Sequence, residues 1–345
     1  MLRRRLFVCL LGCSTGQAAT NVPGQATVVR EAFLMGTTLR AEVAAAERGT
    51  AVVAIQQAFD TVALLESVLS TWREDSEIAR LNHAPPGDTV SLSATLADLL
   101  GEAGRWSRET DGAFDPAIGA LMDAWDLRGR GRVPPAATLA EARAATGFAQ
   151  FGFADVGGRT ARAARRSPAA WLDTGAFGKG VALRAAVAVL RRAGARSGSL
   201  NFGGQVSVLG DGPAAGSWLV PVAHPEQRDV PVATLRVRDA SVSTSAQSER
   251  FVDVDGRRFG HILDPRTGRP VPAWGSVTVV ATDAAVADML STALFVLGPE
   301  TGAAWARRHD VAALFLIRRG RRLEFRTTPA LRPFFASRPL PAPGG

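Results

Sequence analysis

The amino-acid sequence predicts an α+β fold in which helices and strands form one interlocked body. Segments with the apolar spacing of helices and short β-branched segments follow one another without a regular strand–helix–strand order. This irregular order argues against a doubly wound parallel sheet. The chain of 345 residues shows no internal repeat, and its length allows one large domain or two smaller ones.

The pattern of apolar residues locates the expected elements along the chain. Residues 28–43 alternate around Met35-Gly36-Thr37, which predicts a strand pair or a bent strand. Residues 51–69 carry apolar side chains at helical spacing. Further helices are expected over 91–110, 137–146, 178–193 and 284–297. Further extended segments are expected over 151–171, 199–209 (broken at Gly203-Gly204), 230–265 (turns at Asp239, Asp255 and Gly256), 276–281 and 305–326, where a helix end precedes a hairpin. A Pro-rich, loosely packed tail is expected over 332–345.

The first 19 residues are typical of an export signal. A basic start, Met1 to Arg5, precedes an apolar run over 6–11 that is too short to span a bilayer. Arg4-Arg5 resembles a twin-arginine signal, and residues 10–13, Leu-Leu-Gly-Cys, resemble a lipobox. A general secretory cleavage near Ala18 or Ala19 is the third alternative. The expected location is the periplasm, with a membrane anchor only if Cys13 carries a lipid, and no segment after residue 20 is expected to cross a membrane.

The composition of the mature chain excludes several classes of site. Both cysteines, Cys9 and Cys13, lie in the leader, so disulfides, cysteine nucleophiles and thiolate metal sites are excluded from the body. The net charge is +8, but the arginines are scattered, and no nucleic-acid-binding motif accompanies them. Nucleic acid is therefore not expected as a partner. Walker A and Gly-x-Gly-x-x-Gly patterns are absent from the sequence.

Lys179 is the only lysine among 40 lysine and arginine residues. A lysine ammonium is a compact charge on a flexible stem, which the planar guanidinium of arginine cannot imitate. The two flanking glycines, Gly178 and Gly180, favour a position that faces a ligand. The alternative is a surface lysine without a role.

Asp288 and Thr292 are four residues apart in the helix expected over 284–297, which places their oxygens on one face. A carboxylate and a hydroxyl are ligands that suit Mg²⁺. The alternative is an acidic residue favoured by the helix dipole and a threonine that bonds back to its own turn.

His261 is the only histidine in a dense turn motif, within Gly260-His-Ile-Leu-Asp-Pro-Arg-Thr-Gly268. It could act as a general base or serve as a structural histidine. The segments Gly112 to Gly119 and Asn201 to Gly204 are loops where backbone can approach a ligand closely.

These segments, in this order, resemble the FAD:protein FMN transferase (ApbE-type) family over roughly residues 28–327, which we take as the transferase domain. The motifs that carry the resemblance are Phe33-Leu-Met-Gly-Thr37, residues 69–82, Gly112-Ala-Phe-Asp-Pro116, Leu172-Asp-Thr-Gly-Ala-Phe-Gly-Lys-Gly180, Asn201-Phe-Gly-Gly204, Ser243-Thr-Ser245, residues 260–268 and Ala287-Asp-Met-Leu-Ser-Thr292.

The resemblance implies a T-fold-like body of mixed antiparallel sheets and helices. It also implies cleavage of FAD with Mg²⁺, transfer of FMN to a threonine or serine of an acceptor protein, and release of AMP. By position, Asp288, Thr292 and the carbonyl of Ala176 match metal ligands, and His261 matches the histidine associated with transfer. Positions that match flavin or adenine contacts are Met35, Trp72, Ala113, Phe114, Asp115, Asp173, Lys179 and Ile262; Lys179 is also expected to act in catalysis beside the phosphates.

The chain departs from the family pattern at a few of these positions. Trp72 and Ser248 stand where tyrosines are usual, and Gln205 stands where aspartate commonly follows Gly-Gly; Gly178 and Ala246 are further differences. The expected acceptor is an exported or membrane-anchored flavoprotein, either a redox-complex subunit or a regulator of nitrous-oxide reduction. Two other functions stay open at this point, namely a FAD pyrophosphatase and a non-catalytic carrier of FAD.

Overall fold

The computed structural model describes residues 26–156, 159–248, 251–254, 256–320 and 322–336. The leader expected over residues 1–19 lies outside these ranges, as do residues 337–345 of the expected tail.

An eight-stranded sheet in the order β1-β2-β6-β7-β10-β15-β16-β17 forms the centre of the molecule, and all of its neighbouring strands are antiparallel. The α+β class is therefore confirmed. The strands of this sheet are β1 (Ala26–Leu34), β2 (Thr37–Ala45), β6 (Ser197–Phe202), β7 (Gln205–Leu209), β10 (Ser241–Ala246), β15 (Gly275–Ala281), β16 (Ala312–Arg319) and β17 (Arg322–Thr327).

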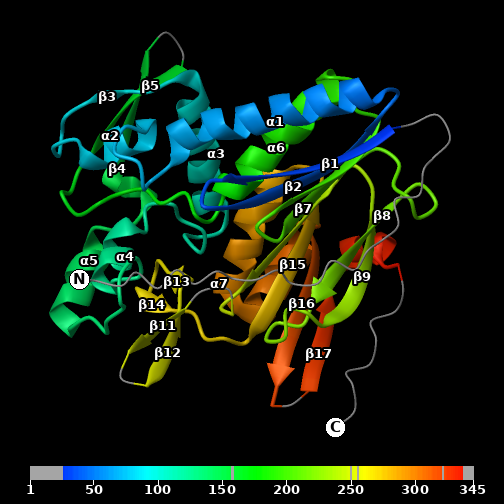
Figure 1. The fold of residues 1–345 in the computed structure, drawn as a ribbon. Coiled ribbons are helices and arrows are strands. Elements are labelled where there is room, and N and C mark those ends of the chain that lie inside the picture. The colour runs from blue at the N-terminus through cyan, green and yellow to red at the C-terminus, as the bar shows by residue number, and fades with distance from the viewer. Residues whose placement is uncertain (1–25, 157–158, 249–250, 255, 321, 337–345) are drawn as a thin grey trace, which may run out of the picture.

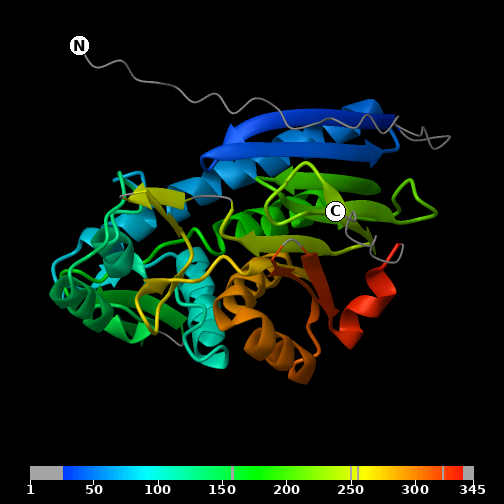
Figure 2. The ribbon, with the colours of Figure 1, turned by 90° about the horizontal axis from the view of Figure 1, so that it is seen from below.

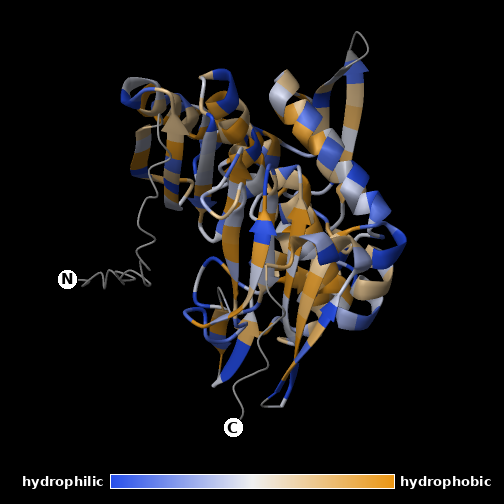
Figure 3. Ribbon diagram, turned by 90° about the vertical axis from the view of Figure 1, so that its right-hand side faces the viewer, coloured by the Kyte–Doolittle hydropathy of each residue, from blue (hydrophilic) through white to orange (hydrophobic). Residues whose placement is uncertain are grey.

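Three long helices, α1 (Arg48–Leu69), α6 (Gly178–Arg192) and α7 (Ala284–Arg308), pack on one face of this sheet (Figures 1 and 2). Helices α1 and α6 share a core with β1, β2 and β6, and α7 shares a second core with β15 and β16. The hairpin of β8 (Trp218–Ala223) and β9 (Pro231–Val237), with the short 3-10 helix η2 (Pro329–Phe334), covers the other face over β7, β10, β15 and β16. Figure 3 shows hydrophobic residues concentrated along the central strands, as burial on both faces requires.

A smaller lobe lies at the ends of α1 and α6 (Figure 1). Its core joins α2 and α3 to the three-stranded sheet β3-β5-β4. The elements of this side and of the neighbouring hairpins are α2 (Glu77–His83), β3 (Val90–Ser91), α3 (Ala94–Glu109), α4 (Gly119–Ala124), α5 (Ala136–Ala144), the 3-10 helix η1 (Phe148–Gln150), β4 (Phe151–Val156), β5 (Arg159–Arg165), β11 (Phe251–Val254), β12 (Arg257–Gly260), β13 (Leu263–Asp264) and β14 (Arg269–Pro270).

The structure confirms two of the turns that the sequence predicted between strands. Gly203 and Gly204 both have positive φ, 56° and 96°, and form the tight hairpin turn between β6 and β7. Such turns favour glycine because an L side chain resists positive φ. Asp239, φ 46°, turns the chain from β9 to β10, as predicted.

Other expectations are wrong in detail. The sequence pattern gave no indication of α2, α4 or β8, which are short and have no extended periodicity. The helix expected over 284–297 does end at a kink, at Gly298 with φ 79°. A second helical segment over 299–308 begins at Pro299 and completes α7, and only its end near Trp305 was expected.

The expectation that nothing after residue 20 could cross a membrane also needs correction. Among the described residues, α1 is long and apolar enough to do so by length and composition. In the structure one face of α1, including Ile55, Phe59 and Val62, is buried in the core against the sheet and α6.

Candidate functional site

A cavity of about 900 Å³ opens where the turn between β1 and β2, the beginning of α6, helix α7 and strand β10 meet. All twelve residues predicted as site residues line it. They are Met35, Trp72, Ala113, Phe114, Asp115, Asp173, Ala176, Lys179, His261, Ile262, Asp288 and Thr292. The structure therefore brings together residues that lie up to 257 positions apart, from Met35 to Thr292.

Asp288 on α7 lies at the bottom of this cavity and is only 4% exposed. The backbone N–H of Gly180 donates to its Oδ2 at 2.9 Å, and Ser243 Oγ donates to its Oδ1 at 3.4 Å. Burial raises the pKa of this carboxyl above its ordinary range, while the charge of Lys179 and these two hydrogen bonds partly oppose the rise. Asp288 does not cap α7, because Asp283 accepts the hydrogen bonds of the helix N-terminus.

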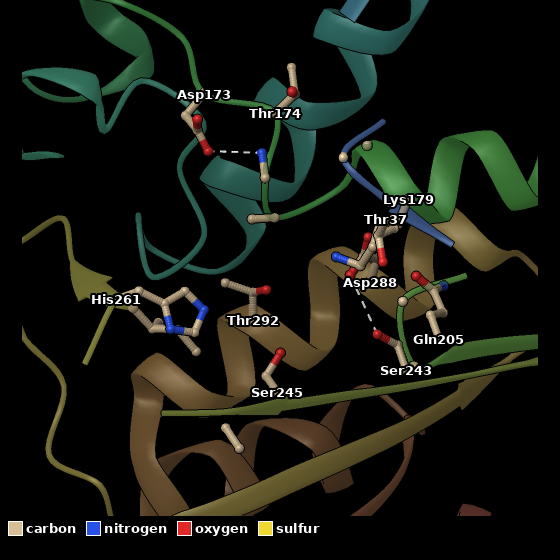
Figure 4. Close-up of a pocket in the computed structure, with 18 of the residues that line it drawn as sticks. Thr37, Asp173, Thr174, Lys179, Gln205, Ser243, Ser245, His261, Asp288 and Thr292 are labelled. Atoms are coloured by element: carbon tan, nitrogen blue, oxygen red, sulfur yellow. Dashed lines mark hydrogen bonds between the residues drawn. The ribbon is translucent and has the colours of Figure 1, made fainter. Parts of the chain in front are cut away.

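Thr292 lies one turn further along α7, and in Figure 4 it lies between Asp288 and His261. Its hydroxyl makes no hydrogen bond to any other residue in the described part of the chain, whereas Ser291 Oγ donates to the carbonyl of Asp288. The alternative of a self-bonded threonine therefore applies to Ser291 and not to Thr292.

Lys179 stands in the first turn of α6, beside Asp288 (Figure 4). Within the described ranges its ammonium has no ion pair and no hydrogen bond, so it is available to a ligand. The N-terminus of α6 adds the positive end of the helix dipole at the same place. Lysine and helix end together form a site for an anion above a buried carboxylate.

Close packing explains the glycine at position 180, next to Lys179. A Cβ on Gly180 would lie 2.4 Å from the carbonyl oxygen of Ala284 and 2.7 Å from Cβ of Asp288. The absence of this side chain lets α6 and α7 approach closely enough for the Gly180 N–H to reach Asp288.

Replacing Gly180 by alanine should force α6 and α7 apart and destabilise the protein by about 1–3 kcal/mol, the usual cost of overpacking. Gly101→Ala in α3 is the matched control, because nothing lies within 4 Å of the added Cβ. We expect that control to be neutral or slightly stabilising. Chemical denaturation of both variants measures the difference, and equal stabilities would contradict the close-packing argument.

Serine hydroxyls on β10 extend the polar floor of the cavity. Ser243 and Ser245 are two residues apart on one strand and both point toward α7, where each hydroxyl lies within hydrogen-bond distance of Ser291 Oγ, at 3.1 and 2.9 Å. From the sequence alone this segment could not be distinguished from a polar turn. The alternation of serines at 241, 243 and 245 is the signal that could have indicated a strand here.

Gln205, at the start of β7, is 3% exposed and lines the same cavity. Its Nε2 donates to the carbonyl of Ala284 at 2.8 Å and to Ser241 Oγ at 3.2 Å, which fixes the orientation of the amide. Its Oε1 is buried and has no hydrogen-bond partner among the residues that the structure describes. A buried oxygen without a donor costs roughly 1–3 kcal/mol, so this atom is expected to be satisfied when a ligand enters.

Asp173 lies on the side of the cavity opposite Gln205 (Figure 4). It follows Leu172 in the loop before α6. Its Oδ2 accepts from the Gly175 N–H at 2.8 Å, as drawn in Figure 4, and its Oδ1 pairs with Arg128 at 3.0 Å. Arg128 was not predicted from the sequence, because it stands in no motif.

The segment Ala113 to Asp115 lines the cavity, but its side chains are more deeply buried or more fully hydrogen-bonded than those of the other predicted site residues. Ala113 and Phe114 are each 1% exposed, so their side chains belong mainly to the core. The Asp115 carboxylate accepts from the backbone N–H groups of Ala117 and Phe148 and from Ser107 Oγ. Burial raises the pKa of Asp115, and these hydrogen bonds limit the rise.

His261 and Ile262 follow the hairpin of β11 and β12. The buried side chain of Gln247 accepts from the Ile262 N–H at 3.0 Å and donates to the Ile262 carbonyl at 2.8 Å. A Cβ on Gly260 would overlap this side chain at 2.0 Å. Gly260 and Gln247 therefore fix the backbone that carries His261 at the side of the cavity opposite Gln205 in Figure 4.

No group of three or more His, Cys, Asp or Glu side chains within the described ranges is arranged to hold a metal ion. A cation at Asp288 would depend on one carboxylate together with neutral oxygens and water. The hydroxyl of Thr292 and the unpaired Oε1 of Gln205 are oxygens of that kind.

Comparison with known proteins identifies relatives of the whole chain. The model of the ApbE family matches residues 35–315. A FAD:protein FMN transferase of Treponema pallidum is 33% identical over 331 residues, which cover 90% of each chain. A protein of the same name from Salmonella typhimurium is 28% identical over 336 residues and 95% of each chain.

Solved structures with the same fold include the flavinyl transferase ApbE of Pseudomonas stutzeri in its apo form. It has a TM-score of 0.79 and 28% identity, and the match covers 91% of this chain and 98% of that one. The ApbE protein of Thermotoga maritima has a TM-score of 0.82 and 26% identity over 90% of this chain and all of that one.

Proposed function

We propose the following details for the reaction of this chain, which belongs to the ApbE family and is similar to the FAD:protein FMN transferases named above. The reaction depends on Mg²⁺, uses a threonine or serine hydroxyl as acceptor, and releases AMP. The enzyme itself transfers FMN from FAD to a protein. The observation that supports the proposed chemistry best is the juxtaposition of a buried carboxylate, Asp288, with the unpaired Lys179 at the end of α6.

The residues present suit Mg²⁺. Asp288 and Thr292 would hold it with the carbonyl of Ala176, all three being hard oxygen donors that line the cavity. The chemistry that Mg²⁺ supplies when bound is neutralisation of charge on the pyrophosphate as its bond to AMP breaks.

The residues of the chain have separate tasks in the transfer. Lys179 and the N-terminus of α6 bind the negative phosphates. His261 accepts the proton of the acceptor hydroxyl on a ring nitrogen as that oxygen forms its bond to the FMN phosphorus. The bond from the same phosphorus to the bridging oxygen breaks, and AMP leaves with that oxygen.

The acceptor is proposed to be an exported or membrane-anchored flavoprotein, of the redox-complex or nitrous-oxide-regulator type, that meets the enzyme in the periplasm. The basis is the leader sequence over residues 1–19.

The test uses the chain without residues 1–19, FAD, Mg²⁺ and a periplasmic flavoprotein domain from the same genome. We expect the acceptor mass to rise by the mass of an FMN group with one equivalent of AMP released. AMP without a labelled acceptor would favour a pyrophosphatase. Bound FAD with neither product would favour a carrier, and both results would contradict the proposed transfer.

Gln205 offers a test of the cation site that does not depend on turnover. In Gln205→Leu the unpaired Oε1 is lost, so Mg²⁺ affinity should weaken about 3- to 10-fold, in line with the loss of one hydrogen bond. The control is Ser241→Ala, which removes an acceptor of Nε2 but leaves Oε1 in place. Titration calorimetry without FAD measures both, and equal affinities in Gln205→Leu and wild type would exclude Gln205 from the site.

A further inference from the structure

Arg128 lines the cavity and contacts two tryptophans, of which Trp72 also lines the cavity. Its guanidinium carbon lies 4.4 Å from the ring centroid of Trp72 and 4.4 Å from that of Trp171. These distances are those of favourable cation–π contacts. Arg128 follows α4, so three segments distant in sequence meet at this point.

Hydrogen bonds hold the guanidinium in this position. It donates to Thr71 Oγ1 at 2.6 Å, to the Thr71 carbonyl at 3.0 Å and to Asp173 Oδ1 at 3.0 Å. Its Nε is buried and has no hydrogen-bond partner in the described part of the chain. The side chain of Trp171 is fixed in turn by a hydrogen bond from its Nε1 to Asp123 Oδ2 at 2.7 Å.

Trp72, by contrast, is 71% exposed although it lines the cavity. An indole with so much free surface would ordinarily rotate between conformers, and fixing it would reduce the affinity for any ring that stacks on it. Contact with Arg128 removes part of this cost before the ligand binds, and it leaves ring surface open toward the cavity.

We propose that Arg128 is a positioning residue for FAD, which holds Trp72 as a preformed surface on which a ring system of the dinucleotide stacks. The inference rests on the proposed function only in taking FAD as the ligand. In this role Arg128 acts through Trp72 and Asp173, the two cavity residues that its guanidinium contacts.

The test is a comparison of FAD affinity and turnover in Arg128→Gln. We expect KM and Kd for FAD to rise about 10-fold, because the stacking surface is no longer preformed, while kcat changes less than about twofold. Quenching of flavin fluorescence on binding should decrease in the same variant. Arg128→Lys keeps the charge beside Asp173 without the planar stack, so its KM should lie between those of wild type and Arg128→Gln.

A double-mutant cycle with Trp72→Leu decides whether Arg128 acts through Trp72. If it does, Arg128→Gln adds no further increase in KM when Trp72 is already leucine. An undiminished effect in that background would overturn the proposal, and so would an unchanged KM in Arg128→Gln. Arg105→Gln is the matched control, because Arg105 stacks 4.6 Å from Trp106 outside the cavity.

Separate titrations with FMN and with AMP identify the stacked ring. A loss of affinity for FMN alone assigns Trp72 to the flavin, and a loss for AMP alone assigns it to the adenine; both support the proposal, and no loss for either overturns it. Failure of the wild type to bind FAD would instead contradict the proposed function.

Discussion

Asp288→Asn is expected to reduce FMN transfer by about a thousandfold at saturating FAD, because the only carboxylate at the proposed cation site is lost. Asparagine has nearly the same shape as aspartate. Its amide oxygen can still accept from the Gly180 N–H, and its amide nitrogen can donate to Ser243 Oγ. The fold should therefore be retained. Initial rates of acceptor labelling measure the effect.

The structural control is the stability of the variant without metal. Removal of a buried, unneutralised charge should leave the melting temperature of Asp288→Asn equal to or above that of the metal-free wild type. Added Mg²⁺ should raise the melting temperature of the wild type and not that of the variant. Normal labelling rates in Asp288→Asn would refute the assignment.

The raised pKa of Asp288 also predicts how pH acts on the metal-free enzyme. Its folded pKa lies above the ordinary value of 3.8, so the folded state holds this proton more tightly than the unfolded state. The resulting stability is present at low pH and is lost as pH rises through the folded pKa. Since Mg²⁺ binds the ionised form, its stabilising effect should appear over the same pH range. In melting curves against pH, Asp288→Asn should lose the Mg²⁺-dependent slope and the part of the metal-free slope that is due to Asp288, while the part due to Asp115, whose pKa burial also raises, should remain.

His261→Asn is expected to lower kcat for transfer by about 100- to 10,000-fold, the usual contribution of a general base. KM for FAD should change little, because the proton of the acceptor hydroxyl is transferred only in the chemical step. Gln247 holds the neighbouring Ile262 backbone independently of the imidazole, so the loop should keep its conformation. Rates of labelling over a range of FAD concentrations separate kcat from KM.

His224 provides a matched control for this variant. It lines the same cavity, but its Nδ1 accepts hydrogen bonds from the Glu226 and Gln227 N–H groups in a turn. We expect His224→Asn to keep kcat within about twofold, since asparagine can accept similar bonds. Full transfer activity in His261→Asn, with FAD affinity retained, would exclude His261 as the base.

Local patterns explain what could be predicted from the sequence. The helical spacing of Asp288 and Thr292 and the turn at Gly203-Gly204 depend on residues only a few positions apart, and the structure has both. The class of fold followed from the irregular order of such segments. Short elements such as α2 and α4 were missed because six or seven residues are too few for a periodic signal.

The strand and helix periodicities, the turn glycines and the motif residues that line the cavity are all encoded in short stretches of the chain. Which of these residues come into contact depends on how the elements pack. Gly180 and Asp288 are 108 residues apart, and Arg128 and Asp173 are 45 apart. The unpaired oxygen of Gln205 and the tryptophan contacts of Arg128 arise where α6, α7, β7 and the loops pack together. Burial, close helix approach and the loss of solvent around a polar atom are properties of that packing, and no local pattern encodes them.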